Sequence, residues 1–249
     1  MDLLFWKKVS ARKLQKVLAA HQVWFSSRQK EGKRANLSDA NLREVDLEGK
    51  DLRRADLSKA KLTRASLNMA DLREADLIGA DLSMADLQEA DMREVNLSQA
   101  DLSNADLNQV NLIMANLGQA KLSGSNLKDA NLFRTYLKGA ELDNVNLSGA
   151  DLREANLSQA KLNNADLSHA NLIMANLSRA NMSGVNLKEA NLFRSYLKDA
   201  DLRRADLRGA DLSGTNLSGA NLEDANLMED QLFTAVIDEL TVLPDGSKG

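Results

Sequence analysis

The stretch ADLREADLIGADLSMADLQEA, residues 70–90, has a leucine at every fifth position and an alanine two residues before each. The same spacing runs from Leu37 to Leu232, where 38 of 40 such positions are Leu and the other two are Met92 and Met182. The chain is therefore a tandem array of A-(D/N)-L-x-x units with no insertion between them.

A period of five fits neither a continuous helix nor a continuous strand. Five steps of about 100° leave successive leucines about 140° apart around a helix, and an odd period sends them to alternate faces of a strand. All leucines point the same way only if each unit is a short strand followed by two turn residues. Ala and Leu then point inward, and Asp or Asn points outward. The pattern predicts an all-β solenoid whose bore is filled by Leu and Ala.

Residues 35 to 237 resemble the pentapeptide-repeat proteins, because the A-(D/N)-L-x-x unit recurs throughout them. The resemblance implies a right-handed quadrilateral β-helix with four units, or 20 residues, in each of about ten coils. A longer duplication lies within the array, since residues 91–150 and 151–210 are identical at 39 of 60 positions. Because 60 is a multiple of both 20 and 15, the duplication alone leaves four-sided and three-sided coils open.

Residues 1–34 are predicted to form an amphipathic helical cap. They hold nine Lys or Arg against two acidic residues, a net +7 that leaves −11 for the rest of the chain. Ser10 can cap a helix, and the apolar stripe that follows consists of Leu14, Val17, Leu18, His21, Trp24 and Phe25. We expect this helix to cover the first coil, which would otherwise expose unpaired edges, with His21 packed in the core. The alternative is a basic helix, preceded by LLFW at residues 3–6, that lies on an anionic membrane or on a partner.

The β-helix is expected to span residues 35–238, with a tail at 239–249 that covers the last coil. Ile237 continues the leucine register, and the stretch VIDELTVLPDG resembles the LPDG-type endings of some family members. We expect Pro244 to end the strand there and the Asp-Gly pair after it to turn the chain.

Two charged residues, Lys50 and Asp230, stand at positions where an inward Ala is expected. A buried unpaired charge is costly, and both residues lie near an end of the array. We therefore predict local unwinding or an outward turn of the chain at each, and contact with a ligand is the alternative.

One wall of a 20-residue coil gathers large apolar side chains that point outward. Ile113, Met114 and Phe133 fall in adjacent coils with Tyr136 at the next corner, and the duplication repeats them as Ile173, Met174, Phe193 and Tyr196, with Phe233 further along the same column. Coils of 15 residues would separate Ile113 from Phe133, so the clustering favours 20. An apolar patch rimmed by Arg is typical of protein-binding surfaces, although passive stacking of large residues would also stabilise a sheet surface.

We predict a non-enzymatic scaffold or binding protein of the cytoplasm, whose partner is an unidentified protein or a second copy. The chain has no Cys and only two His, His21 and His169, the latter at an exposed turn position. These residues cannot form the usual Zn or Fe ligand sets, and no phosphate-loop or nucleophile motif is present. No cofactor, metal or small-molecule substrate is expected. Direct nucleic-acid binding is not expected of an acidic rod.

The alternative function is inhibition of DNA gyrase or another topoisomerase by DNA mimicry. Fifteen Asp stand directly before the repeat Leu or Met, concentrated between Asp46 and Asp106, and some gyrase-binding pentapeptide-repeat proteins are understood to mimic DNA with such charge. Two observations weigh against it. Short Asp and Asn side chains commonly bond turn backbone, and one Asp column lies beside the arginines Arg53, Arg73 and Arg93.

Overall fold

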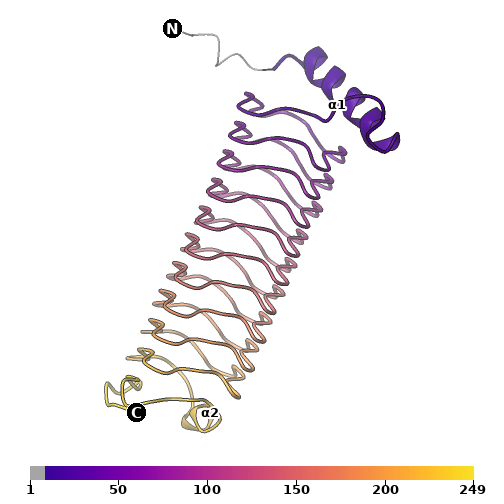
Figure 1. Ribbon diagram of the computed structural model, residues 1–249. Coiled ribbons are helices and arrows are strands. Elements are labelled where there is room, and N and C mark those ends of the chain that lie inside the picture. Colours follow the sequence, from indigo (N-terminus) through magenta and orange to yellow (C-terminus); the bar gives the residue numbers. More distant parts are fainter. Residues whose placement is uncertain (1–8) are drawn as a thin grey trace.

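The five-residue unit closes into a coil because each coil pairs with the next at matching positions. The computed structural model describes residues 9–249, so the LLFW segment at residues 3–6 lies outside the described residues. Asn36 forms a parallel bridge with Asp56 and Asn41 forms one with Lys61, and bridges between residues 20 apart continue along the rod. Four such bridges per coil give the rod four walls (Figure 1). The pairing is confined to single residues, shorter than the strands expected, because the turns take up the rest of each unit.

The turn of each unit follows from its backbone hydrogen bonds. The Ala75 amide donates to the Leu72 carbonyl at 3.0 Å, and the Glu74 amide donates to Arg93 of the next coil, also at 3.0 Å. Glu74 has a φ of 57°, in the left-handed region that non-glycine residues rarely adopt. Stacking of identical turns satisfies these amides and holds the strained residue in place.

The Asp or Asn before each Leu has a local structural role. Asp71 Oδ1 accepts from the Arg73 amide at 3.3 Å, and Asn131 Oδ1 accepts from the Phe133 amide at 3.2 Å. These bonds fix the first turn residue, which confirms the local-turn interpretation of the acidic positions.

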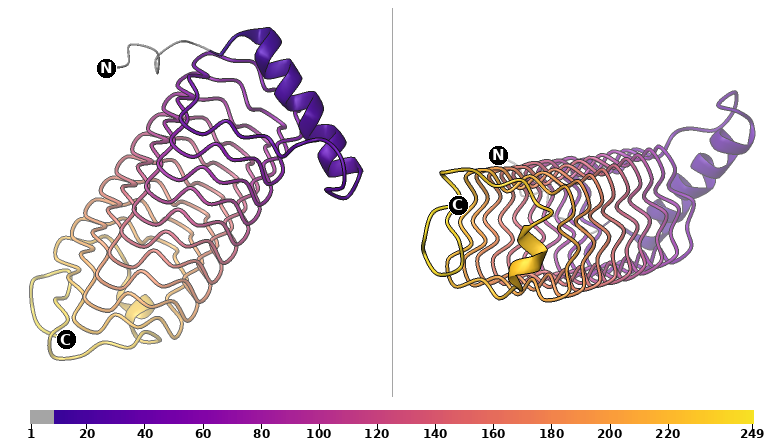
Figure 2. Two further views of the ribbon diagram at one scale, coloured as in Figure 1. Left: turned by 45° about the horizontal axis from the view of Figure 1, so that its top comes forward. Right: turned by 90° about the horizontal axis from the view of Figure 1, so that it is seen from below.

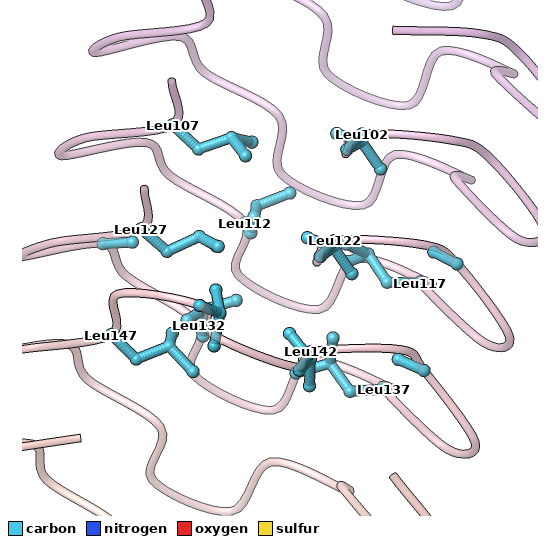
Figure 3. Packing of buried hydrophobic residues seen from close by; sticks show 14 of the residues in the cluster. Leu102, Leu107, Leu112, Leu117, Leu122, Leu127, Leu132, Leu137, Leu142 and Leu147 are labelled. Atoms are coloured by element: carbon cyan, nitrogen blue, oxygen red, sulfur yellow. The ribbon is translucent and has the colours of Figure 1, made fainter. Parts of the chain in front are cut away.

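Leucine and alanine fill the bore, as the sequence predicts. Successive leucines stack in layers along it, among them Leu102, Leu122 and Leu142 (Figure 3), and all three are at most 1% exposed. Most interior hydroxyls donate to backbone carbonyls, for example Ser125 to Leu122 at 2.7 Å and Thr135 to Leu112 at 2.8 Å, as buried polar groups usually do. Ser195 is an exception, because its buried Oγ has no hydrogen-bond partner among the described residues.

The two charges at inward positions are not buried. Lys50 is exposed beside the amino-terminal helix, and Asp230 is exposed within helix α2 (Glu229–Leu232). The prediction is confirmed at Asp230, where the chain leaves the coil to form α2. It is wrong at Lys50, which keeps the regular coil pairing: its amide donates to the Leu47 carbonyl at 3.1 Å and its carbonyl accepts from the Asp71 amide at 3.0 Å. Lys50 is exposed although its backbone stays in the first coil.

The carboxy-terminal end departs from the predicted register. The unit around Leu232 forms α2 in place of a β-bridge, and Leu232 is only half-buried. Ile237, expected to point inward, is 36% exposed. Asn221 bridges Val242, 21 residues on. A repeat unit can therefore have the expected leucine and still not form part of the β-helix.

Pairing with the final coil continues one step further than expected before the chain turns. Pro244 does not end the pairing, because its carbonyl accepts from the Asp224 amide at 3.0 Å. Gly246, with a φ of 81°, turns the chain as predicted, and its amide donates to the Leu243 carbonyl at 2.9 Å.

Helix α1 (Ala11–Ser26) lies across the amino-terminal end of the rod (Figure 2). Ser10 Oγ accepts from the Lys13 amide at 3.3 Å and caps the helix, as the sequence indicates. Its stripe faces the rod: Leu14 is 6% exposed, and half-buried neighbours on it are Val17, Leu18, Trp24 and Phe25. The Arg53 guanidinium of the coil beneath lies 3.6 Å from the centroid of the Phe25 ring. No helix within residues 9–249 is long and apolar enough to cross a membrane.

His21 joins the helix to the first coil. It is fully buried, its Nδ1 accepts from the Ala35 amide at 3.0 Å, and Nε2 has no protein partner within the described residues. Burial lowers the pKa of His21 below its ordinary value. The charge of Asp51 and the backbone of Arg53 oppose this effect, and the charges of Arg34 and Arg53 lower the pKa further. The packing of α1 on the first coil therefore favours the neutral form of His21.

Acidification should loosen this helix before it affects the rod. Unfolded chains bind a proton near pH 6.5 while folded His21 resists it, so His21 costs stability as the pH falls from about 6.5 through the folded pKa. We expect the melting temperature to fall between pH 7 and pH 5 more in the wild type than in His21→Gln, which keeps an acceptor but does not titrate. Circular dichroism melts of both chains check this, and equal pH dependence would contradict it.

Candidate functional site

The predicted wall residues lie together because their coils are adjacent. Asn111 bridges Asn131, and the Met114 amide donates to the Phe133 carbonyl at 3.0 Å. The turns that carry Ile113 and Phe133 are thus direct neighbours, and the same contact joins Met174 to Phe193 at 3.0 Å. We call the two groups together the apolar wall: Ile113, Met114, Phe133 and Tyr136 in the first copy, and Ile173, Met174, Phe193 and Tyr196 in the second.

Methionine and tyrosine are the most open members of the apolar wall. Met114 is 56% exposed and Tyr136 is 42% exposed, and their second-copy equivalents are similarly open at 48% and 49%. The Ile and Phe residues between them are half-buried. Flexible methionines beside a rigid ring form a surface that can adapt to an apolar partner.

Arginines border the Phe133 ring. The guanidinium carbons of Arg134 and Arg153 lie 4.9 Å and 5.4 Å from its centroid. Arg134 also pairs with Glu154, Nε to Oε2, at 2.7 Å, and Arg153 pairs with Asp151. The hydrogen bond from Arg153 lowers the pKa of Asp151, although burial opposes it. The rim of the first copy is therefore charged but internally paired.

The rim of the second copy is different. Arg194 lies 5.0 Å from the Phe193 centroid, but the next coil has Ser213 and Gly214 at the positions of Arg153 and Glu154. The duplication has preserved the apolar residues and changed their charged border.

Tyr136 lies over a glycine. A Cβ on Gly118 would lie 3.0 Å from Tyr136 Cε1, so the ring packs against the bare backbone of the coil before it. Beside it is a polar groove of about 320 Å³ whose lining includes Gln99, Gln119 and Gln159. Ser178 stands at the equivalent position beneath Tyr196. The two copies therefore present different surfaces around the same tyrosine.

Phe233 does not extend the apolar wall. The Gly214 amide pairs with the Thr234 carbonyl at 2.8 Å, one residue beyond its expected partner, so Phe233 is displaced to the end of α2, where it is 82% exposed. There it lines a groove at the end of the rod together with Leu227, Leu232, Ile237 and Leu243. Sequence reasoning missed this second apolar cluster. The replacement of the inward Ala by Asp230 was the feature of the sequence that could have indicated it.

The acidic column near the amino-terminal end is balanced by arginine. Arg53 pairs with Asp51 through Nη2 at 2.5 Å and approaches Asp71 Oδ2 through Nε at 3.3 Å, and Arg73 approaches Asp91 similarly at 3.5 Å.

Within the described part of the chain no group of three His, Cys, Asp or Glu could hold a metal ion. His169 is exposed, as predicted, with Nδ1 3.3 Å from Glu189 Oε2.

Comparison with known proteins identifies the repeat. The sequence profile described as Pentapeptide repeats (8 copies) matches overlapping segments from residue 35 to residue 229. Among solved structures, HetL, a pentapeptide repeat protein involved in heterocyst differentiation regulation from the cyanobacterium Nostoc, is 36% identical over 92% of this chain and 97% of its own, with a TM-score of 0.47. A trypsin-treated form of QnrB1, a plasmid-mediated fluoroquinolone resistance protein, is 15% identical over 86% and 92%, with a TM-score of 0.51. Curated protein sequences gave no match.

Proposed function

The chain belongs to the pentapeptide-repeat family and forms its right-handed β-helix, and we propose that it is a non-enzymatic scaffold that binds a protein partner through the apolar wall. The observation that carries the proposal is the exposure of Met114 and Tyr136 beside half-buried Phe133, repeated 60 residues later in the second copy. Exposed apolar patches with a charged rim characterise protein interfaces, and aromatic residues and Met are enriched there.

The filled bore supports a binding role over a catalytic one. A side chain tuned for acid-base chemistry needs a site that shifts its pKa and excludes water, whereas the outward carboxylates here bond turn amides or arginines. The partner is either a different protein or a second copy of this chain. Because the two copies of the wall have different rims, we expect the first copy, with its paired Arg134 and Arg153 and the Tyr136 groove, to discriminate between partners.

The alternative, gyrase inhibition by DNA mimicry, has weaker support. A DNA mimic needs a continuous negative surface, and the Asp51, Asp71 and Asp91 column is paired with arginines. QnrB1 is a fluoroquinolone resistance protein, but its 15% identity concerns the fold. A gyrase supercoiling assay separates the two proposals.

Removing the exposed methionines of the wall should weaken partner binding and leave the rod intact. We expect Met114→Ser with Met174→Ser to weaken binding at least tenfold, the scale of about 1.4 kcal/mol or more that interface anchors contribute. Molar mass by light scattering measures self-association, and affinity capture from a cell extract measures a foreign partner.

A matched control uses methionines outside the wall. Met69→Ser with Met84→Ser removes side chains that are 58% and 50% exposed, at the same turn position and with the same positive φ. If both double variants retain the mass and the captured proteins of the wild type, the wall is passive stacking and the proposal is wrong.

A further inference from the structure

The carboxy-terminal end of the rod exposes apolar side chains in a group. Phe233 is 82% exposed, Met228 65%, Leu240 63% and Val236 52%. Phe233 lines a groove of about 490 Å³ whose walls also include Leu227, Leu232, Ile237 and Leu243. Figure 2 shows helix α1 across the opposite end of the rod, whereas α2 at this end is one short turn. An apolar patch of this kind marks an interaction site.

The charge around this groove indicates what can occupy it. Residues 223–249 contain seven Asp or Glu and one Lys, and Glu229 and Asp245 line the groove itself. Two such ends brought face to face would repel each other. An occupant that is apolar and basic is therefore favoured over a second carboxy-terminal end.

The chain itself contains a segment with those properties. Residues 3–8, LLFWKK, combine four large apolar side chains with two lysines and lie outside the described residues. They join the rod at Val9, whose amide donates to the Asn41 carbonyl of the first coil at 3.0 Å. Figure 1 places this end of the rod opposite α2.

This segment cannot reach the groove of its own molecule. Eight extended residues span at most about 29 Å. Ten coil steps separate Asn36 from Val236, and at the usual spacing between paired strands they make about 48 Å. Only the segment of another molecule can occupy the groove.

We propose that the carboxy-terminal groove binds residues 3–8 of a second copy, so that molecules associate head to tail. The apolar side chains enter between Phe233, Ile237 and Leu243, and the lysines face Glu229 and Asp245. A head-to-tail contact that does not close generates open chains of molecules. Association should therefore grow with protein concentration and weaken at high salt, which screens the exposed charges.

Two surface variants of the full chain test the proposal by complementation. The head variant carries Phe5→Ser and Trp6→Ser and keeps its groove. The tail variant carries Phe233→Ser and Ile237→Ser, both at exposed positions, and keeps its amino-terminal segment. Alone, each should remain a monomer in light scattering at concentrations where the wild type forms larger species. Mixed in equal amounts, they should form a 1:1 dimer that cannot extend, because its two outer ends are both mutated.

The other outcomes each overturn the proposal. A symmetric contact between carboxy-terminal ends would leave the head variant dimeric and give no complementation. A membrane-binding segment would make the head variant lose affinity for anionic vesicles while its mass stayed that of the wild type. A wild type that is monomeric at every concentration and salt would exclude the contact. Val23→Ser, at a 45% exposed position on α1, is the control that should change nothing.

Discussion

Ala150→Asp should cost the rod about 3 to 5 kcal/mol of unfolding free energy, the scale of an uncompensated buried charge. Ala150 is fully buried in the bore, between Ala130 of the preceding coil and Ala170 of the following one. The side chains of Ala130 and Ala170 are methyl groups that cannot pair with a carboxylate. The backbone amides near Ala150 already donate to carbonyls within their coil or in an adjacent one. Urea denaturation at pH 7 measures the loss.

The matched control for this prediction is Ala150→Ser. Ser125 shows that a hydroxyl at an inward position can donate to the carbonyl three residues before it, so the serine variant should stay within about 1 kcal/mol of the wild type. The deficit of Ala150→Asp should also shrink as the pH falls toward 4, because a protonated carboxyl no longer buries a charge and the folded form takes up the proton. A loss below about 1 kcal/mol at pH 7 would mean that the bore admits water or opens locally.

The regular part of the rod could be predicted because its pattern allows one solution. The five-residue period excludes a helix and a long strand, and the observed interior of Leu and Ala agrees with that reasoning. The period does not determine the number of residues per coil. Family resemblance and the clustering of Ile113 with Phe133 predict 20, and the bridge between Asn36 and Asp56 confirms that number.

The carboxy-terminal end could not be predicted, because the leucine register continues through it unchanged. The decisive interactions come from Gln231, whose Nε2 donates to the Leu207 and Ala210 carbonyls, both at 2.8 Å, and whose Oε1 accepts from the Met228 amide at 2.8 Å. The Gln231 side chain thus satisfies the Ala210 carbonyl, which a further coil would have paired, and adds a second donor to the Leu207 carbonyl, which already accepts from the Ala210 amide. The spacing of hydrophobic residues in the sequence does not predict these hydrogen bonds of Gln231.

The sequence predicts where the apolar wall lies but not the side-chain contacts within it. Once 20 residues per coil are assumed, the outward columns list Met114, Phe133 and Tyr136 directly. The contact of Tyr136 with Gly118 joins residues in neighbouring coils and depends on ring orientation. The guanidinium of Arg153 near Phe133 likewise depends on a rotamer. Both features require coordinates.

Leu132→Ala and Leu232→Ala should differ in cost although the sequence gives both residues the same position in the repeat. Leu132 is fully buried in the bore (Figure 3), and its truncation leaves a cavity in a close-packed interior. We expect a loss of about 2 to 5 kcal/mol. Leu232 is half-buried in α2 and borders the open groove, so we expect about 1 kcal/mol.

Urea denaturation of the two variants, followed by circular dichroism, measures this difference. The solenoid lets each coil contact only its neighbours, so a cavity in the middle weakens the interfaces on both sides, whereas a change at the end affects one. Leu37→Ala gives an independent check, because Leu37 is 4% exposed although it lies in the first coil. It should behave like Leu132→Ala if burial decides the cost. Equal losses for Leu132→Ala and Leu232→Ala would mean that the last unit packs in solution as the leucine register predicts, with α2 unwound and the groove closed.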